Sequence, residues 1–386
     1  MIRSRSLPLV CLPMLLFLAL PVSGAQPPGG IFARLDKNGD GKLSREELPE
    51  PLRRNFQRVD TNRDGFITPD EDAAFRNRRR AGAVGRPAPR PPQIPEGIQV
   101  QRDIPYADTD NPRQMLDLYL PKKRATDKRL PVVVWIHGGA WRAGNKAGGM
   151  RNLAELVASG HYAGVSVAYR LTDEAIWPNQ IHDCKAAIRW IRAHAEKHGL
   201  DPERIGVWGS SAGGHLVAML GTSGGVEELE GTLGKHTEQS SRVTCVVNYF
   251  GPSDLLTMGK YPSQMNHDAA GSPESRLVGG PVQERRDAAR SASPTTYVSK
   301  DDPPFLIVHG DQDPLVPHNQ SVRLSELLQK AGTDVMFITI TGGSHGGFRS
   351  EELTRRVHRF FDKRLCGREA EISGGSIPQG QGDRQR

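Results

Sequence analysis

The sequence predicts an α/β fold in which a doubly wound, mostly parallel sheet carries helices on both faces, preceded by a small α-helical module. Six short apolar runs lie between residues 132 and 340, and amphipathic stretches separate them. Nearly continuous apolar runs suit strands that are covered on both faces, and alternation of strand and helix implies parallel pairing. The predicted strands are residues 132–136, 164–168, 205–208, 245–248, 305–308 and 335–340. Upstream, an acidic twelve-residue pattern occurs twice, which predicts the helical module.

The composition is that of a globular protein. The chain has 386 residues, of which 37% are hydrophobic and 25% charged, so it can form one large domain and a smaller module. The net charge of +7 does not indicate a nucleic-acid partner, because the arginine cluster at 76–80 has no interleaved aromatic residues. The expected segments are a signal peptide at 1–25, the helical module at 26–80, a linker rich in Pro, Gly and Arg at 81–97, the α/β domain at 98–366 and a disordered polar tail at 367–386.

The N-terminus has the features of a secretory signal peptide. Arg3 and Arg5 precede an apolar run at 7–20, and small residues follow up to Ala25. The run is too short to span a bilayer, and no later segment approaches about 18 consecutive apolar residues. We therefore expect an exported protein, periplasmic, extracellular or at the cell surface, without stable membrane insertion. The three cysteines beyond the leader are an odd number and are expected to be buried thiols, with one bridge as the alternative.

The repeated acidic pattern at 36–47 and 60–71 fits a twelve-residue calcium-binding loop. Such a loop has side-chain oxygen ligands at positions 1, 3 and 5, a glycine at 6, a backbone carbonyl at 7 and a bidentate glutamate at 12. The predicted Ca²⁺ ligands are Asp36, Asn38, Asp40, the carbonyl of Lys42 and Glu47 in the first loop, and Asp60, Asn62, Asp64, the carbonyl of Phe66 and Glu71 in the second. A surface turn rich in Asp, Asn and Gly is the alternative, and two complete matches favour calcium.

This N-terminal segment resembles the EF-hand family. Leu43 and Ile67, at position 8 of each loop, are expected to pair in the short strand that couples two hands. The loops start only 24 positions apart, so the segment 44–59 would serve both hands despite Pro49 and Pro51. This spacing favours calcium sites that stabilise the structure over a calcium sensor whose helices move apart to open a groove.

A G-x-S-x-G pentapeptide occurs three times, centred on Ser211, Ser223 and Ser344. A nucleophilic serine needs a tight turn between a strand and a helix, where flanking glycines leave room and the hydroxyl stands above the sheet edge. Only Ser211 has this context, because the run 205–208 precedes it and the apolar stretch 212–220 follows. The sequence therefore predicts Ser211 as a nucleophile, with a structural glycine-rich turn as the alternative.

Two later loops supply a candidate acid and base. His345 follows the last predicted strand and Asp313 the one before it, both at carboxyl ends, where open α/β sheets place their sites. We expect His345 to act as general base and Asp313 to orient it. Asp311 is the rival acid and Asp254 a weaker one. Four other histidines lie within or beside predicted helices and are expected to be surface or packing residues: His182, His215, His318 and His358.

Backbone N–H donors for a developing oxyanion are expected in two places. The glycines Gly138 and Gly139 follow the first strand and let the backbone approach a substrate oxygen closely. The N–H of Ala212, directly after the nucleophile, would complete an oxyanion hole with them. A glycine-rich turn that only caps the strand is the alternative.

From about residue 98 to 365 the chain resembles the bacterial carboxylesterases related to hormone-sensitive lipase, which include acetyl and feruloyl esterases acting on plant-type polysaccharides. The matching stretches are 137–141, 201–205, 209–214, 249–254, 293–294 and 303–310, together with Asp313 and His345. The resemblance implies an α/β-hydrolase fold and a serine carboxylesterase that needs no cofactor for catalysis. One departure is Ala140, where lipase-type members have a third glycine. This replacement costs nothing if the φ angle of Ala140 is negative.

The segment 255–300 lies where such hydrolases insert a cap, and it is rich in Gly, Pro, Ser and Arg. Its polarity favours short-chain or aromatic acyl esters of a polar alcohol, such as acylated carbohydrates, over long-chain lipids. Trp141 and Trp177 are candidate pocket walls, with core packing as the alternative. Competing functions are a serine peptidase on the same fold and a calcium-dependent binding or adhesion protein whose hydrolase domain is inert.

Overall fold

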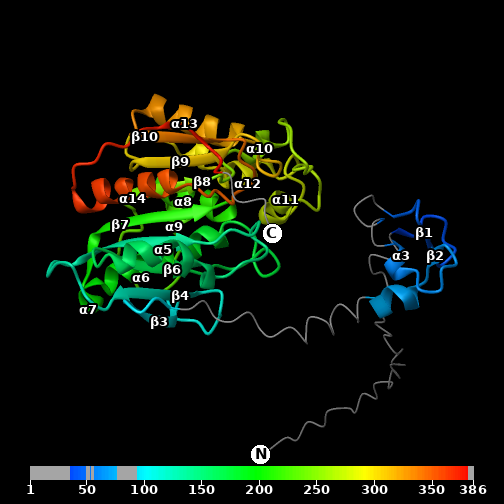
Figure 1. Ribbon diagram of the computed structural model, residues 1–386, viewed down its shortest axis with the longest axis horizontal. Coiled ribbons are helices and arrows are strands. Elements are labelled where there is room, and N and C mark those ends of the chain that lie inside the picture. Colours follow the sequence, from blue (N-terminus) through cyan, green and yellow to red (C-terminus); the bar gives the residue numbers. More distant parts are fainter. Residues whose placement is uncertain (1–34, 49–52, 54–55, 76–93, 381–386) are drawn as a thin grey trace, which may run out of the picture. The chain divides into compact units, whose positions relative to one another are not determined.

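The computed structural model describes residues 35–48, 53, 56–75 and 94–380, and the chain divides into two compact units, Met1–Pro91 and Pro92–Arg386 (Figure 1). The predicted signal peptide, most of the predicted linker and the last six residues lie outside the described residues. No helix in the described ranges is long and apolar enough to cross a membrane.

The smaller unit is built around two short strands, β1 (Leu43–Ser44) and β2 (Phe66–Ile67). They pair antiparallel with Leu43 opposite Ile67, which confirms the predicted coupling of the two loops. Helix α3 (Phe56–Val59) precedes the second loop, and residues 69–75 are helical. Among the residues of this unit that the structure describes, the buried core consists of Leu43, Leu48, Phe56, Val59 and Ile67. The segment predicted to serve both hands is described only in part, because residues 49–52 and 54–55 lie outside the description.

The larger unit is organised by a nine-stranded sheet in the order β11-β10-β9-β8-β7-β5-β6-β4-β3 (Figure 1). The strands are β3 (Ile98–Pro105), β4 (Met115–Pro121), β5 (Leu130–Ile136), β6 (Ala163–Val167), β7 (Leu200–Ser210), β8 (Cys245–Tyr249), β9 (Phe305–Gly310), β10 (Val335–Thr341) and β11 (Gly375–Pro378). Strand β4 pairs antiparallel with both β3 and β6, and every other neighbouring pair is parallel. The predicted mostly parallel α/β sheet is confirmed.

Helices cover both faces of the sheet and enclose two hydrophobic cores. Along β5, Val132 and Val134 face one core, while Val133 and Trp135 face the other. This division explains the unbroken apolar run, because both faces of the strand are buried. The first core includes side chains of α6, α8 and α13, and the second includes side chains of α5 and α14. The helices of this unit are α5 (Gly149–Ala158), α6 (Asn179–Ala193), α7 (Ala195–His198), α8 (Ala212–Thr222), α9 (Glu227–Glu230), α10 (Leu255–Met258), α11 (Pro273–Val278), α12 (Arg286–Ser291), α13 (Asn319–Ala331) and α14 (Glu351–Cys366).

The prediction of a disordered tail at 367–386 is corrected at residues 375–378. Residues 375–378 form β11, which pairs parallel with β10 and places Ile377 opposite Ile340. The side chain of Ile377 is buried in the second core. Ile372 packs against the same core and is partly buried. The edge of β10 offers backbone partners and a hydrophobic surface, and neither is visible in the polar composition of the tail.

Three parallel strands carry the site. β7, β9 and β10 all end at the same edge of the sheet, as parallel strands must, and the loops that leave them bear Ser211, Asp313 and His345. A fourth loop, which leaves β5, carries Gly138 and Gly139. The fold therefore brings four chain segments together at one edge.

Candidate active site

Ser211 occupies the tight turn between β7 and α8. Its backbone has φ 55° and ψ −123°, a sparsely populated conformation that is typical of a strained nucleophile turn. The flanking glycines are required by close packing. A Cβ atom on Gly209 would lie 2.3 Å from the carbonyl oxygen of Gly213, and one on Gly213 would lie 2.1 Å from that of Ile136. The serine is thus held above the sheet by backbone contacts that no larger residue permits.

The other two pentapeptide serines lie in different surroundings. Ser223 is buried at the end of α8, where its hydroxyl donates to the carbonyl oxygen of Met219 at 2.6 Å. Ser344 is exposed in the loop after β10. Of the three predicted candidates, Ser211 is the one that the structure places against His345.

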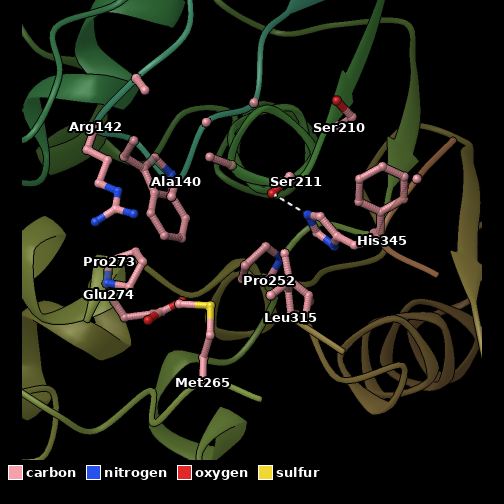
Figure 2. A pocket seen from close by; sticks show the side chains of 18 of the residues that line it. Ala140, Arg142, Ser210, Ser211, Pro252, Met265, Pro273, Glu274, Leu315 and His345 are labelled. Atoms are coloured by element: carbon pink, nitrogen blue, oxygen red, sulfur yellow. Dashed lines mark hydrogen bonds between the residues drawn. The ribbon is translucent and has the colours of Figure 1, made fainter. Parts of the chain in front are cut away.

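The three predicted triad residues form one hydrogen-bonded chain. The Oγ atom of Ser211 lies 3.0 Å from Nε2 of His345 (Figure 2). Nδ1 of His345 lies 2.7 Å from Oδ2 of Asp313. A carboxylate can only accept, so Nδ1 carries the proton and Nε2 presents its lone pair to the serine hydroxyl. The ring of Phe250 packs edge-to-face against His345, with centroids 4.7 Å apart. This arrangement suits His345 for removing the proton of Ser211.

Both carboxylate oxygens of Asp313 accept hydrogen bonds. Its Oδ1 accepts the backbone N–H groups of Leu315 at 2.8 Å and Val316 at 3.0 Å, while Oδ2 faces two imidazoles, those of His345 and His309. Burial alone would raise the pKa of Asp313, but hydrogen bonds from His309 and His345 outweigh it and hold the pKa well below its usual range. Asp313 therefore remains a carboxylate at neutral pH.

His309 was not predicted as a site residue. It lies at the end of β9, fully buried, with Nε2 3.1 Å from Asp313 Oδ2 and 3.0 Å from the carbonyl oxygen of Val316. Both partners are acceptors, so Nε2 carries the hydrogen, and Nδ1 can accept from the hydroxyl of Ser321 at 2.7 Å. The only signal in the sequence is that His309 precedes Asp313 by four residues at the end of the same strand.

The two rival acids have other partners. Asp311 accepts the backbone N–H of Gly342 at 2.7 Å and so ties the loop after β9 to the loop after β10. Asp254 forms an ion pair with Nε of Arg323 at 2.7 Å. Of the three candidate acids, the structure places Asp313 against His345.

The predicted oxyanion loop packs directly on the nucleophile turn. A Cβ atom on Gly138 would lie 2.7 Å from the carbonyl oxygen of Ser210 and 3.3 Å from Cβ of Ser211. Gly139 has φ +119°, which only glycine adopts readily. Its carbonyl oxygen accepts the N–H groups of Arg142 at 3.1 Å and Ala143 at 3.0 Å, which closes the loop into a turn.

Ala212 supplies the third predicted donor. It is the first residue of α8, and the N–H groups of a first helical turn have no acceptor within their own helix. The same helix end favours negative charge through the helix dipole. Gly138, Gly139 and Ala212 all line the cavity that contains Ser211, so the backbone of both segments surrounds the nucleophile.

The condition under which Ala140 would cost nothing, a negative φ angle, is not met. Ala140 has φ 55° and the following Trp141 has φ 54°, both in the left-handed region, which costs a residue with a Cβ about 1–2 kcal/mol. The buried side chain of Trp141 holds this conformation, because its Nε1 donates to Nδ1 of His215 at 3.1 Å. Burial lowers the pKa of His215 to about 4, so the ring is neutral and can accept.

The two tryptophans have different roles. Both are buried, but Trp141 lines the cavity at the active site, whereas Trp177 donates from Nε1 to Ser291 Oγ at 3.0 Å. The cavity has a volume of about 610 Å³. Figure 2 shows side chains that line it. Its apolar wall consists of Trp141, Phe250, Pro252, Met265, Pro273, Leu315 and Val316, and its polar wall outside the triad includes Arg142, His267 and Glu274. A mostly apolar pocket with a few polar groups is typical of a small-molecule site.

The two predicted calcium loops have the expected turn geometry. Gly41 and Gly65, at position 6 of each loop, have φ +77° and +84°. Glu71, at position 12, folds back over its loop, and hydrogen bonds from Thr68 and Thr61 lower its pKa to about 2. Within the described residues, no three acidic, His or Cys side chains converge as a ready-made metal cluster.

One oxygen in these loops fits a cation. Oδ1 of Asp60 is buried and has no hydrogen-bond partner among the residues that the structure describes. Asp60 occupies position 1 of its loop, and an inward carboxylate oxygen without a donor is what a calcium ligand requires. The hard oxygen donors of both loops therefore suit Ca²⁺.

Known proteins match both units. The BD-FAE family model matches residues 116–328, more than half of the chain, and the EF-hand model matches residues 30–49 and 52–71. Esterase LipC of Mycobacterium tuberculosis is 31% identical over 288 residues, which cover 73% of this chain and 67% of LipC. Esterase LipQ of the same organism is 28% identical over 314 residues, which cover 78% and 72% of the two chains.

Solved structures show the same relationship. A truncated carbohydrate esterase from gut microbiota is 36% identical with a TM-score of 0.64, over 69% of this chain and 96% of that one. Esterase 2 of Thermogutta terrifontis, with propionate bound, is 27% identical with a TM-score of 0.57, over 74% of this chain and all of that one. The chain therefore belongs to the BD-FAE family of α/β-hydrolase carboxylesterases, with an EF-hand pair before the hydrolase domain in the sequence.

Proposed function

We propose that this carboxylesterase cleaves short-chain or aromatic acyl esters of hydroxylated alcohols, such as acylated carbohydrates, by nucleophilic catalysis at Ser211. The observation that carries the mechanism is the continuous relay from Ser211 through His345 to Asp313, with 3.0 Å and 2.7 Å between the bonded atoms. Each member has the partner that its role requires.

The reaction follows from the positions of the protons. Ser211 Oγ attacks the ester carbonyl carbon while its proton passes to Nε2 of His345. The oxyanion is stabilised by backbone N–H groups of Gly138, Gly139 and Ala212. His345 then gives the proton to the leaving alcohol oxygen, the carbon–oxygen bond breaks, and an acyl-serine remains. A water molecule then attacks the acyl carbon while its proton passes to His345. His345 returns the proton to Ser211 Oγ as the bond between Oγ and the acyl carbon breaks, and the acid leaves.

The substrate class is inferred from the cavity. Residues between β8 and β9 contribute Met265, His267, Pro273 and Glu274 to its wall, so this segment forms part of a compact pocket of about 610 Å³. Such a volume suits a small acyl group and a ring-sized alcohol. The structural relative described as a carbohydrate esterase supports an acylated carbohydrate as substrate.

We also propose that the two EF-hand loops bind Ca²⁺ and stabilise the smaller unit without entering the reaction. The triad operates with side chains alone, and the oxygen donors of the loops lie in a separate compact unit. We further propose that the chain is exported and loses residues 1–25. N-terminal sequencing of the mature protein tests the export proposal, which predicts Gln26 as the first residue.

The esterase proposal is tested with p-nitrophenyl acetate, methyl ferulate and an acetylated xylo-oligosaccharide. We expect turnover of at least one of these esters and a loss of about 10⁴-fold or more in kcat for Ser211→Ala. The matched controls Ser223→Ala and Ser344→Ala carry the same substitution in the other two pentapeptides and should retain activity. Full turnover by Ser211→Ala, with loss in either control, would overturn the assignment.

A further inference from the structure

A buried acid–base pair lines the active-site cavity outside the triad. His267 and Glu274 are 1% and 3% exposed, and both contribute to the cavity wall. Figure 2 shows Glu274 on the side of the pocket opposite Ser211 and His345, beside Met265. The catalytic relay makes no use of either residue, so their burial in the cavity wall requires another explanation.

The proton on His267 can be assigned from its neighbours. Ser263 Oγ donates to the carbonyl oxygens of Pro314 and Leu315, each at 3.1 Å, so it accepts from Nε2 of His267 at 3.1 Å. The other ring nitrogen, Nδ1, lies 3.2 Å from Oε1 of Glu274. This contact is an ion pair when the ring of His267 is protonated.

One oxygen of the pair has no partner. Oε2 of Glu274 is buried without a hydrogen bond to any part of the chain that the structure describes. Folded proteins rarely leave a buried carboxylate oxygen unsatisfied, and such a group in a ligand cavity points to a donor supplied by the ligand. Met265, which lies beside it, is an unbranched and flexible side chain that can move when a ligand enters.

We propose that Glu274, supported by His267, is a hydroxyl-recognition site that accepts a hydrogen bond from an O–H group of the ester substrate. The inference rests on the proposed function and narrows its substrate class to esters that carry a free hydroxyl. A substrate with this hydroxyl satisfies Oε2, whereas one without it leaves the oxygen buried and unpaired. One hydrogen bond to a charged group corresponds to a preference of about 10- to 100-fold in kcat/KM.

The hydroxyl can belong to the alcohol or to the acyl group, and matched substrates distinguish the two. The first pair is a monoacetylated methyl xyloside and its deoxy analogues, each lacking one ring hydroxyl. The second pair is methyl ferulate and its analogue without the 4-hydroxyl. We expect the wild-type enzyme to prefer the hydroxylated member of one pair by about 10-fold or more.

The decisive variant is Glu274→Leu. It should bring the preference close to one, by lowering kcat/KM for the hydroxylated ester and raising it for the deoxy ester, since no unpaired oxygen remains. Glu274→Gln keeps an acceptor oxygen in the same volume and should retain part of the preference. The control Glu284→Gln, at an exposed position of the same cap segment, should leave the preference unchanged.

Two results would overturn the inference. One is a wild-type enzyme without preference in either pair, and the other is an unchanged preference in Glu274→Leu. If Glu274→Leu does not fold, the isosteric Glu274→Gln decides, because an undiminished preference there also refutes the site. The readout is a ratio within an active enzyme, so it is separate from the test of Ser211, which concerns whether esters are hydrolysed at all.

Discussion

Nε2 of His309 lies 3.1 Å from Oδ2 of Asp313, the same oxygen that accepts Nδ1 of His345 at 2.7 Å. The carboxylate that orients the general base is therefore shared with a second, buried imidazole. His309 restricts the rotation of Asp313 and takes part of its negative charge, so it is a positioning residue rather than a reacting one.

We expect His309→Leu to move the acidic limb of the kcat/KM profile to higher pH. Without the donor, the pKa of Asp313 rises from its lowered value, because one of the two histidine hydrogen bonds that hold it low is lost, so the carboxylate is protonated at a higher pH. The weaker orientation of Asp313 should also lower kcat/KM about 10-fold. The pH profile with p-nitrophenyl acetate measures both effects.

His309→Gln is the matched control, because its amide Nε2 can donate to the same oxygen. It should restore the acidic limb toward its wild-type position. A His309→Leu enzyme with the wild-type profile and a lowered Tm would show that His309 only packs.

Asp313→Asn should lose about 10³- to 10⁴-fold in kcat, because an amide cannot stabilise the imidazolium and favours the wrong tautomer of His345. Asp311→Asn should lose little, since Asp311 holds a backbone N–H of the neighbouring loop. Steady-state kinetics on the two variants give the ranking. The reverse order would assign the acid role to Asp311.

Asp313 should also contribute to stability in a pH-dependent way. Its pKa in the folded protein is lowered, chiefly by hydrogen bonds from His309 and His345 acting against burial. The contribution is therefore complete above the unfolded-state pKa of about 3.9 and is lost as the pH falls through the lower folded-state pKa. The difference in Tm between wild type and Asp313→Asn should shrink from about pH 5 toward pH 2. A constant difference over this range would contradict the assignment.

Gly139→Ala should reduce kcat by about 10²- to 10³-fold, because the loop that presents the oxyanion donors must distort. An added Cβ would lie 2.2 Å from the carbonyl oxygen of Ala143, and φ at this position is +119°. Gly148→Ala is the control, with φ −68° and no heavy atom within 4 Å of the added Cβ. Equal kcat values for the two variants would argue against a role of the loop in catalysis.

Chelation of calcium should lower the unfolding midpoint of the smaller unit and leave kcat at 25 °C nearly unchanged. For dissociation constants of about 0.1–1 mM, 10 mM Ca²⁺ would stabilise the native loops by about 1.4–2.7 kcal/mol per site. Calorimetry with and without EGTA, on wild type and Glu71→Gln, measures the effect. Reversible loss of turnover on chelation, absent from a shortened chain that begins near Pro95, would instead make the loops a regulatory device.

Residue types and the order of the elements determine where the catalytic residues meet and how the two loops of the smaller unit pair. Ser211, Asp313 and His345 each follow a predicted strand, and parallel strands end at one edge, so their meeting follows from the order alone. Leu43 and Ile67 were predicted to pair because the loop pattern fixes their register. These inferences needed no knowledge of side-chain packing.

The remaining features depend on tertiary contacts. The left-handed conformation of Ala140 is imposed by the anchored ring of Trp141, and nothing in the residue type reveals it. The sequence shows His309 only as a residue of a buried strand, and its contact with Asp313 is visible only in the folded structure. The pairing of His267 with Glu274 arises in an irregular segment, where neither strand nor helix periodicity indicates which side chains will meet.

The short strand β11 also affects whether the sheets of two molecules can pair along their edges. The outer strands of a sheet expose unpaired backbone groups that can recruit strands from other chains. Here one outer strand is only four residues long and ends in Pro378, which has no N–H to offer. The opposite outer strand, β3, is interrupted by a register shift between Gln101 and Ile104, with Asp103 at φ 55°. Both margins of the sheet thus resist edge-to-edge aggregation.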